Sequence, residues 1–177
     1  MLLNIRGMNP GFNSRTKWKM PYLKLALENR CRTTNTTPAA IGLTETHLKS
    51  YISKAQVELP NYEVYRSDRS KRTYGGVSLY IHKNIPVTES IEFDNKVCEA
   101  VCCVSSAINS VIFCAYRPPD ASYSEFLEML TFIEHQIMEN ENTEITILGD
   151  FNFPNISWPS RSIASTGWRF IFQNHFP

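Results

Sequence analysis

The stretch ILGDFNFPNISW, residues 147–158, ends a strand-like apolar run with a carboxylate and an amide. The run reaches Gly149 and then presents Asp150 and Asn152 on either side of Phe151. On an extended segment, residues two apart point to the same side, so we expect Asp150 and Asn152 to share one face while Phe151 points toward the core. In layered α/β folds, strand ends that face one side assemble sites. The stretch therefore predicts the rim of a functional site.

Three other strand-like runs end in polar side chains. Asn4 closes the first run of the chain, and Glu45 closes AAIGLTE. Tyr116 and Arg117 follow the apolar part of SVIFCAYRPP. Each of these features alone has a simple structural explanation: a solvated glutamate, an Asx-type turn in GDFN, or a rigid strand exit before proline. Their joint occurrence indicates strand ends that converge on one site.

The spacing of apolar residues predicts strands mixed with helices. A helix over residues 122–139 is indicated by apolar residues at helical spacing and by the capping-box pair Ser122 and Glu125. Other helices are expected over residues 21–31, near 50–58 and over 163–176. This mixture favours a mixed α/β sandwich over a doubly wound parallel sheet. Strands are expected at residues 2–5, 39–45, 62–68, 75–83, 96–106, 110–119 and, as the last strand, 144–152.

Composition and charge are those of a globular domain. The chain has 177 residues, of which 42% are hydrophobic and 20% are charged, which suggests one domain. The net charge of +1 does not argue for a nucleic-acid partner and does not exclude a local basic patch. No window approaches the ~18 apolar residues of a membrane span, and the N-terminus does not resemble a signal peptide. We expect no membrane association and no secretion.

The five cysteines are odd in number and lack metal-ligand spacing. Most of them lie within apolar, strand-like runs. We interpret them as reduced core residues of an intracellular protein. They are Cys31, Cys98, Cys102, Cys103 and Cys114.

Motifs along most of the chain resemble those of one superfamily. In their order and separation they are similar to the endonuclease/exonuclease/phosphatase superfamily, and more narrowly to the apurinic/apyrimidinic-type endonuclease domain of non-LTR retrotransposons. The motifs that carry the resemblance are Asn4 in LLNIRG, Glu45 in IGLTETHL, YRSDR with YGGVSLYI (residues 65–81), CEAV around Glu99, AYRPP (residues 115–119), and ILGDFN followed by Pro154 and Trp158.

The resemblance implies a fold and a cofactor. The fold would be the DNase-I-like four-layer α/β sandwich with mixed sheets. The cofactor would be Mg²⁺, with Mn²⁺ as an alternative, held mainly by Glu45 with Asn4 beside it. Mg²⁺ prefers one or two carboxylates together with waters and substrate phosphate, which fits these residue types.

The resemblance also implies roles for the remaining polar residues. Asp150 would orient or deprotonate the attacking water, and Asn152 would donate a hydrogen bond to the phosphate oxygens. Tyr116 would stabilise the charge that develops on the scissile phosphate. Arg69 and Arg117 are expected either to contact phosphate or to pair with carboxylates inside the fold.

The chain departs from the family pattern at two places. The family's site is completed near its C-terminus by further strands and a Ser-Asp-His-like motif, whereas this sequence stops at FIFQNHFP. His175 precedes any aspartate and is not expected to substitute, and His47 is expected to be a solvated or loop residue. Arg6 stands where the family often has an acidic residue, which predicts weaker metal binding. We therefore expect a single partial domain over residues 1–177, lacking its C-terminal strands, with weak or no activity as truncated.

Three functions remain open. The first is a Mg²⁺-dependent endonuclease that nicks DNA as part of a retrotransposon polyprotein, beside a reverse transcriptase, with nuclear residence implied by that task. The second keeps the fold but acts on phosphoinositide, sphingomyelin or RNA. The third is a non-catalytic remnant that binds nucleic acid or a partner.

Overall fold

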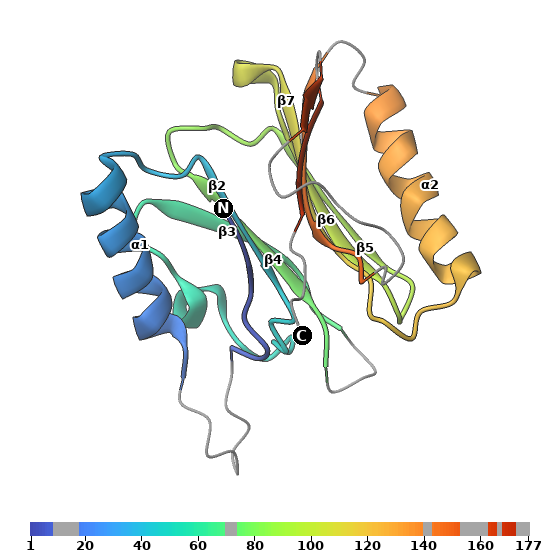
Figure 1. Cartoon of the computed structure of the whole chain (residues 1–177), viewed down its shortest axis with the longest axis horizontal. Coiled ribbons are helices and arrows are strands. Elements are labelled where there is room, and N and C mark those ends of the chain that lie inside the picture. Colours follow the sequence, from blue (N-terminus) through green and yellow to red (C-terminus); the bar gives the residue numbers. More distant parts are fainter. Residues whose placement is uncertain (9–17, 70–73, 140–142, 153–162, 166–167, 173–177) are drawn as a thin grey trace.

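The chain forms four layers, in the order α1, a first sheet, a second sheet and α2 (Figure 1). The computed structural model describes residues 1–8, 18–69, 74–139, 143–152, 163–165 and 168–172. Both sheets contain parallel and antiparallel pairs. The predicted four-layer α/β sandwich with mixed sheets is therefore confirmed.

The first sheet has the strand order β1–β2–β4–β3 and is covered by α1 (Met20–Thr34). β1 and β2 are parallel, and the other pairs are antiparallel. A short 3₁₀ helix, Lys54–Val57, precedes β3. The strands are β1 (Leu2–Asn4), β2 (Ala40–Thr44), β3 (Tyr62–Ser67) and β4 (Val77–His82).

The second sheet has the strand order β5–β6–β7–β8–β10–β9 and is covered by α2 (Tyr123–Glu139). β8 lies parallel to both β7 and β10. A 3₁₀ turn, Ser106–Ile108, connects β6 to β7. The strands are β5 (Glu89–Asp94), β6 (Glu99–Ser105), β7 (Ser110–Tyr116), β8 (Glu144–Asp150), β9 (Ile163–Ser165) and β10 (Trp168–Phe172).

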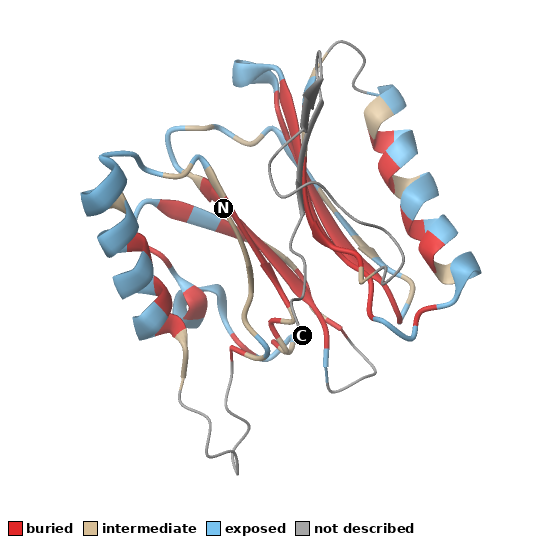
Figure 2. Cartoon of the chain, viewed as in Figure 1, coloured by how far each residue is buried: buried red, intermediate tan, exposed pale blue. Residues whose placement is uncertain are grey.

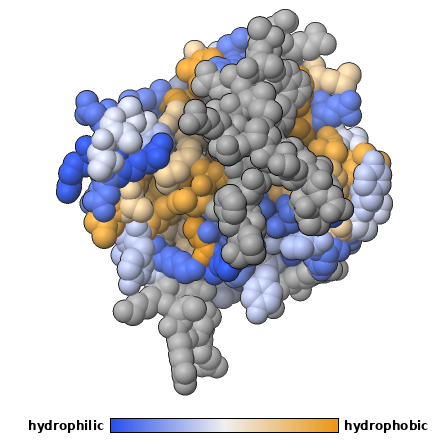
Figure 3. All heavy atoms as spheres, in the orientation of Figure 1, coloured by the Kyte–Doolittle hydropathy of each residue, from blue (hydrophilic) through white to orange (hydrophobic). Residues whose placement is uncertain are grey.

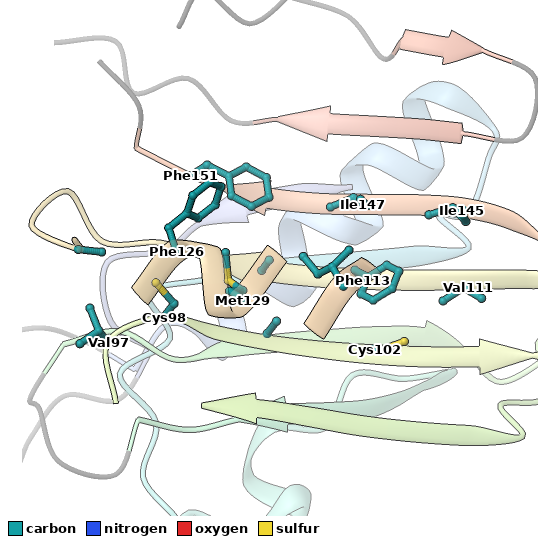
Figure 4. Close-up of a cluster of buried hydrophobic side chains, with 14 of the residues drawn as sticks. Val97, Cys98, Cys102, Val111, Phe113, Phe126, Met129, Ile145, Ile147 and Phe151 are labelled. Atoms are coloured by element: carbon teal, nitrogen blue, oxygen red, sulfur yellow. The ribbon is translucent and has the colours of Figure 1, made fainter. Parts of the chain in front are cut away.

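Alternate side chains of β7 pack on opposite faces of the second sheet. Val111 and Phe113 belong to the apolar cluster beneath α2 (Figure 4). Ile112 and Cys114 point the other way, into the cluster between the two sheets. Because both faces are covered, every residue of β7 is buried, as the continuous red of the central strands indicates (Figure 2). A continuous apolar run is what a strand buried on both faces requires.

The start of α2 is fixed by the predicted capping box. The Ser122 N–H donates to Glu125 Oε2 at 2.8 Å, and the Glu125 N–H donates to Ser122 Oγ at 3.3 Å. Two N–H groups that the first helical turn leaves unpaired are thereby satisfied. The helix then packs Phe126, Met129 and Ile133 onto the second sheet.

The structure corrects three sequence expectations. Residues 163–176 do not begin a helix: β9 and β10 form there and extend the second sheet, so residues 144–152 are not the last strand. Residues 173–176 lie outside the described part. The helix expected near 50–58 is only the short 3₁₀ helix. β5 was not predicted, because its exposed, charged residues alternate with half-buried ones at the sheet edge.

The cysteines of the described segments are free, and Cys98, Cys102, Cys103 and Cys114 are buried. Burial raises the pKa of the Cys102 and Cys114 thiols to about 12, so these side chains act as apolar core groups. Among the helices that the structure describes, none is long and apolar enough to cross a membrane.

An apolar groove of about 470 Å³ separates α1 from β1, and apolar surface is visible beside α1 in Figure 3. Its lining includes Leu3 and Ile5 on the strand side and Tyr22 and Leu23 on the helix side. The groove contains none of the predicted site residues, so it is not the candidate active site.

Candidate active site

Four predicted residues meet where strands of the two sheets end. Asn4 ends β1 and lies opposite Thr44 at the end of β2, directly before Glu45. Tyr116 and Asp150 are register partners at the ends of β7 and β8. Each of these strand pairs is parallel, so its polar ends lie at the same edge. The sandwich brings the two edges together.

Hydrogen bonds connect the four side chains across the sheets. Asn4 Nδ2 donates to Glu45 Oε1 and to Asp150 Oδ2, both at 2.9 Å. The Tyr116 hydroxyl donates to Glu45 Oε1 at 3.2 Å. One amide nitrogen thus holds two carboxylates that are separated by 105 positions in the chain.

The surroundings of the site favour a protonated tyrosine between carboxylates. Asp150 is 1% exposed and Tyr116 is 4% exposed. Burial, reinforced by the negative charges of Glu45 and Asp150, raises the pKa of Tyr116 above its ordinary value. The Tyr116 hydroxyl therefore stays protonated at neutral pH and remains a hydrogen-bond donor.

Glu45 occupies the left-handed backbone region, with φ of 52°. Such a conformation is uncommon for a residue other than glycine and persists where neighbouring contacts enforce it. The Glu45 carbonyl accepts the Gly7 N–H at 2.7 Å, and the next N–H, from Thr46, donates to the Gly76 carbonyl at 3.2 Å. These bonds tie the segments after β1 and before β4 to the segment that carries Glu45.

The donor atoms fit a hard divalent cation. Glu45 and Asp150 both contact the same amide nitrogen, so their oxygens converge on one place, and Mg²⁺ takes one or two carboxylates plus waters. Within the described ranges, no group of three or more His, Cys, Asp or Glu side chains could hold a metal ion. The site therefore does not have the full protein cage of a structural zinc site.

Asn4 is oriented by its own neighbours. Its Oδ1 accepts the Arg6 N–H at 3.1 Å, while its Nδ2 faces the carboxylates. In this arrangement Asn4 positions Glu45 and Asp150. Its role as a direct metal ligand stays a prediction.

Asn152 lies differently from the prediction. Its φ of 46° is left-handed, so the extended backbone of β8 does not continue through Asn152, and the expected shared face with Asp150 stays a prediction. Asn152 Nδ2 donates to the Arg117 carbonyl at 2.8 Å. Phe151 does point into the core, where its ring meets that of Phe126 at 6.2 Å. A hydrogen bond from Asn152 to phosphate stays a prediction.

The two arginines make contacts within the fold. Arg69 is 4% exposed and donates to both carboxylate oxygens of Glu99, with Nη2 at 2.9 Å from Oε2. Its Cζ also lies 5.8 Å from the centre of the Tyr116 ring. Arg117 donates to the backbone carbonyls of Asn152 at 3.0 Å and Ala121 at 2.6 Å. The carboxylate pairing anticipated as one alternative therefore holds for Arg69, whereas the guanidinium of Arg117 binds backbone oxygens.

Sequence reasoning missed His47 as a neighbour of the site. The side chain is 16% exposed rather than solvated, and its Nε2 lies 3.9 Å from Glu45 Oε2. Burial lowers the pKa of His47, and the Glu45 charge opposes this shift. The available signal was its spacing: a residue two positions after the strand-end glutamate remains next to it when the chain turns.

The Arg69 guanidinium occupies the space that a side chain at Gly75 would need. A substitution at Gly75 should therefore lower stability. The φ of Gly75 is 115°, and a Cβ there would overlap the Arg69 guanidinium. We expect Gly75→Ala to lower the free energy of unfolding by at least ~2 kcal/mol, because it adds backbone strain and displaces a buried cation. Urea denaturation checks this, with exposed Ser50→Ala as the control. Equal stabilities of Gly75→Ala and the control would contradict it.

The fold and the site geometry together define a layered α/β protein with an acidic centre at its strand ends. The model of the Endonuclease/Exonuclease/phosphatase family matches residues 1–177. The chain therefore belongs to this family, whose members are hydrolases that act on phosphodiester bonds and generally use divalent metals. No curated protein sequence matches the chain significantly.

Solved structures share the fold at low sequence identity. A 3′ phosphatase (NExo) from Neisseria, bound to a product DNA hairpin, is 15% identical with a TM-score of 0.58, over 86% of this chain and 56% of that chain. TDP2 from D. rerio, complexed with single-strand DNA product, is 14% identical with a TM-score of 0.52, over 84% and 60%. The human Nocturnin catalytic domain is 12% identical with a TM-score of 0.55, over 85% and 63%. The chain thus spans less than two thirds of each of these structures.

Proposed function

We propose that this chain is a divalent-cation-dependent phosphodiesterase that nicks DNA, from the endonuclease of a non-LTR retrotransposon. The observation that carries the chemistry is the Asn4 amide, which holds Glu45 and Asp150 at 2.9 Å each, with the Tyr116 hydroxyl on Glu45. DNA as the substrate is supported by similar folds bound to product DNA. The retrotransposon origin rests on the motifs quoted from the sequence.

Each residue has a role in this proposal. Glu45 and Asn4 would hold Mg²⁺ or Mn²⁺, which when bound polarises the phosphoryl oxygen and neutralises charge on it. Asp150 would orient or deprotonate the attacking water, and its buried carboxylate is held in position by the Asn4 amide. Tyr116, kept protonated, would donate a hydrogen bond to the phosphate oxygen that gains charge. Asn152 would donate to a second phosphate oxygen.

The cellular setting belongs to the same proposal. The chain would be a single partial domain that acts beside the reverse transcriptase of its polyprotein, in the nucleus, where the target DNA lies. The alternatives are a phosphoesterase with another substrate and a non-catalytic remnant that binds nucleic acid.

Nicking of supercoiled plasmid by the purified, folded chain tests the proposal. We expect open-circular product in Mg²⁺ or Mn²⁺, none in EDTA, and none from Glu45→Gln. RNA, phosphoinositide and sphingomyelin are offered in parallel. If one of these compounds is cleaved in preference to DNA, that compound replaces DNA as the proposed substrate. If the chain binds DNA but cleaves none of the four substrates, the result would favour the non-catalytic remnant.

A further inference from the structure

Tyr74 exposes an aromatic ring at the edge of the candidate active site. The residue is 68% exposed. Its ring centre lies 5.1 Å from that of His47, at an interplanar angle of 71°. Of the aromatic ring pairs within the described segments, this is the one that includes an exposed residue. An exposed ring that already rests on a second ring presents apolar area to a ligand at a low cost in side-chain entropy.

Backbone contacts fix the His47 half of the Tyr74–His47 ring pair. The His47 N–H donates to the Gly75 carbonyl at 2.8 Å, directly after Tyr74. A Cβ added at Gly7 would lie 2.7 Å from His47 Nδ1, so the backbone at Gly7 packs against the imidazole. The His47 ring therefore packs against the Gly7 backbone and against the Tyr74 ring.

The ring pair adjoins Glu45 of the candidate active site through His47. His47 Nε2 is 3.9 Å from Glu45 Oε2, and the Tyr74 ring contacts the His47 ring. Lys19 and Lys49 lie near His47, where their charges add to the burial that lowers the pKa of His47. Lys19 Nζ contacts the carbonyls of Ile5 and Arg6, beside Gly7, and Lys49 Nζ contacts the Arg69 carbonyl at 3.1 Å. Aromatic rings beside cations are the combination that binds single strands: bases stack on the rings and phosphates meet the charges.

We propose that the Tyr74–His47 ring pair stacks an unpaired nucleobase of the nucleotide next to the scissile phosphate. This deepens the proposed function and rests on it. The ligand is a DNA strand with an unstacked base. Stacking recognises the flat face that all bases share, so the ring pair would hold the strand in register with Glu45 without reading its sequence.

Binding of a fluorescent single-stranded oligonucleotide, measured by anisotropy in EDTA so that no cleavage occurs, tests the inference. Alanine at one stacking position costs ~1–3 kcal/mol per base, so we expect Tyr74→Ala to weaken binding about tenfold. Tyr74→Phe keeps the ring and should bind within about twofold of the wild type. Tyr123→Ala is the matched control, since Tyr123 is 75% exposed at the start of α2.

Oligonucleotides that lack one base separate stacking from a general loss of affinity. Removing the stacked base should weaken binding to the wild type and leave binding to Tyr74→Ala unchanged. Wild-type affinity in Tyr74→Ala would overturn the stacking inference and leave the proposed function standing. Equal losses in Tyr74→Phe and Tyr74→Ala would also overturn it. No binding of DNA by the wild type would overturn the proposed function together with this inference.

Discussion

Asp150→Asn is expected to lower the rate of Mg²⁺-dependent nicking by ~10²–10⁴-fold, the contribution of one positioned acid–base group. The substitution keeps the size of the side chain and an oxygen that can accept from Asn4 Nδ2, so the fold should persist. It removes the charge and the basicity that the proposed role requires. Single-turnover nicking kinetics at saturating protein measure the effect on the chemical step.

The control for Asp150→Asn is Glu63→Gln, an exposed carboxylate on β3. Its nicking rate should equal that of the wild type. A loss of less than about fivefold in Asp150→Asn, with wild-type stability, would remove Asp150 from the proposed chemistry and return Asp150 to a purely structural role.

Arg69→Met is expected to cost ~3–5 kcal/mol of stability at neutral pH, the typical result of removing one partner of a buried ion pair. Glu99 is 0% exposed, and Arg69 donates to both of its oxygens and to the Val97 carbonyl. The substitution leaves the carboxylate buried without its cation. It also removes the guanidinium beside the Tyr116 ring, so nicking should fall as well.

The pH dependence of the stability loss in Arg69→Met shows whether the loss comes from the buried charge of Glu99. Burial raises the pKa of Glu99 from 4.5 to about 7, and the hydrogen bonds and charge of Arg69 oppose this rise. The folded state therefore binds a proton more readily than the unfolded state, and this group's contribution to stability declines as pH rises from about 4.5 to 7. Without Arg69 the pKa rises further, so the decline should be larger and should continue to higher pH.

Urea denaturation of wild type and Arg69→Met at pH 5 and pH 8 measures both effects. The loss of stability should be larger at pH 8 than at pH 5, because protonated Glu99 no longer needs the cation. Arg32→Met, an exposed arginine in the last turn of α1, is the control. If Arg69→Met loses the same amount of stability at pH 5 and at pH 8, the loss comes from packing and not from the unpaired charge of Glu99.

The strand ends that build the site could be predicted because they follow apolar runs. Runs such as those of β7 and β8 are buried on both faces, so their first polar residue marks where the strand leaves the core. Asn4, Glu45, Tyr116 and Asp150 were found in this way, and the structure connects them by hydrogen bonds. The α2 boundary was predictable because its capping box is a local feature.

Features set by tertiary contacts could not be predicted. The left-handed conformations of Glu45 and Asn152 depend on hydrogen bonds to Gly7 and Arg117, far away in the sequence. The burial of His47 likewise depends on Gly7 and Tyr74. The sequence pattern predicts a helix over residues 163–176, but β10 forms a strand there. The strand is stabilised by its pairing with β8, a tertiary contact that the short segment itself does not encode.

The central claim is that Glu45 and its neighbours form a divalent-cation site, and direct titration of the folded chain with Mn²⁺ tests it most directly. Electron paramagnetic resonance counts free Mn²⁺, so the readout does not depend on activity. We predict binding to the wild type, at least tenfold weaker binding to Glu45→Gln, and wild-type binding to Glu63→Gln. Equal Mn²⁺ affinity in Glu45→Gln and the wild type, with both folded, would contradict the claim.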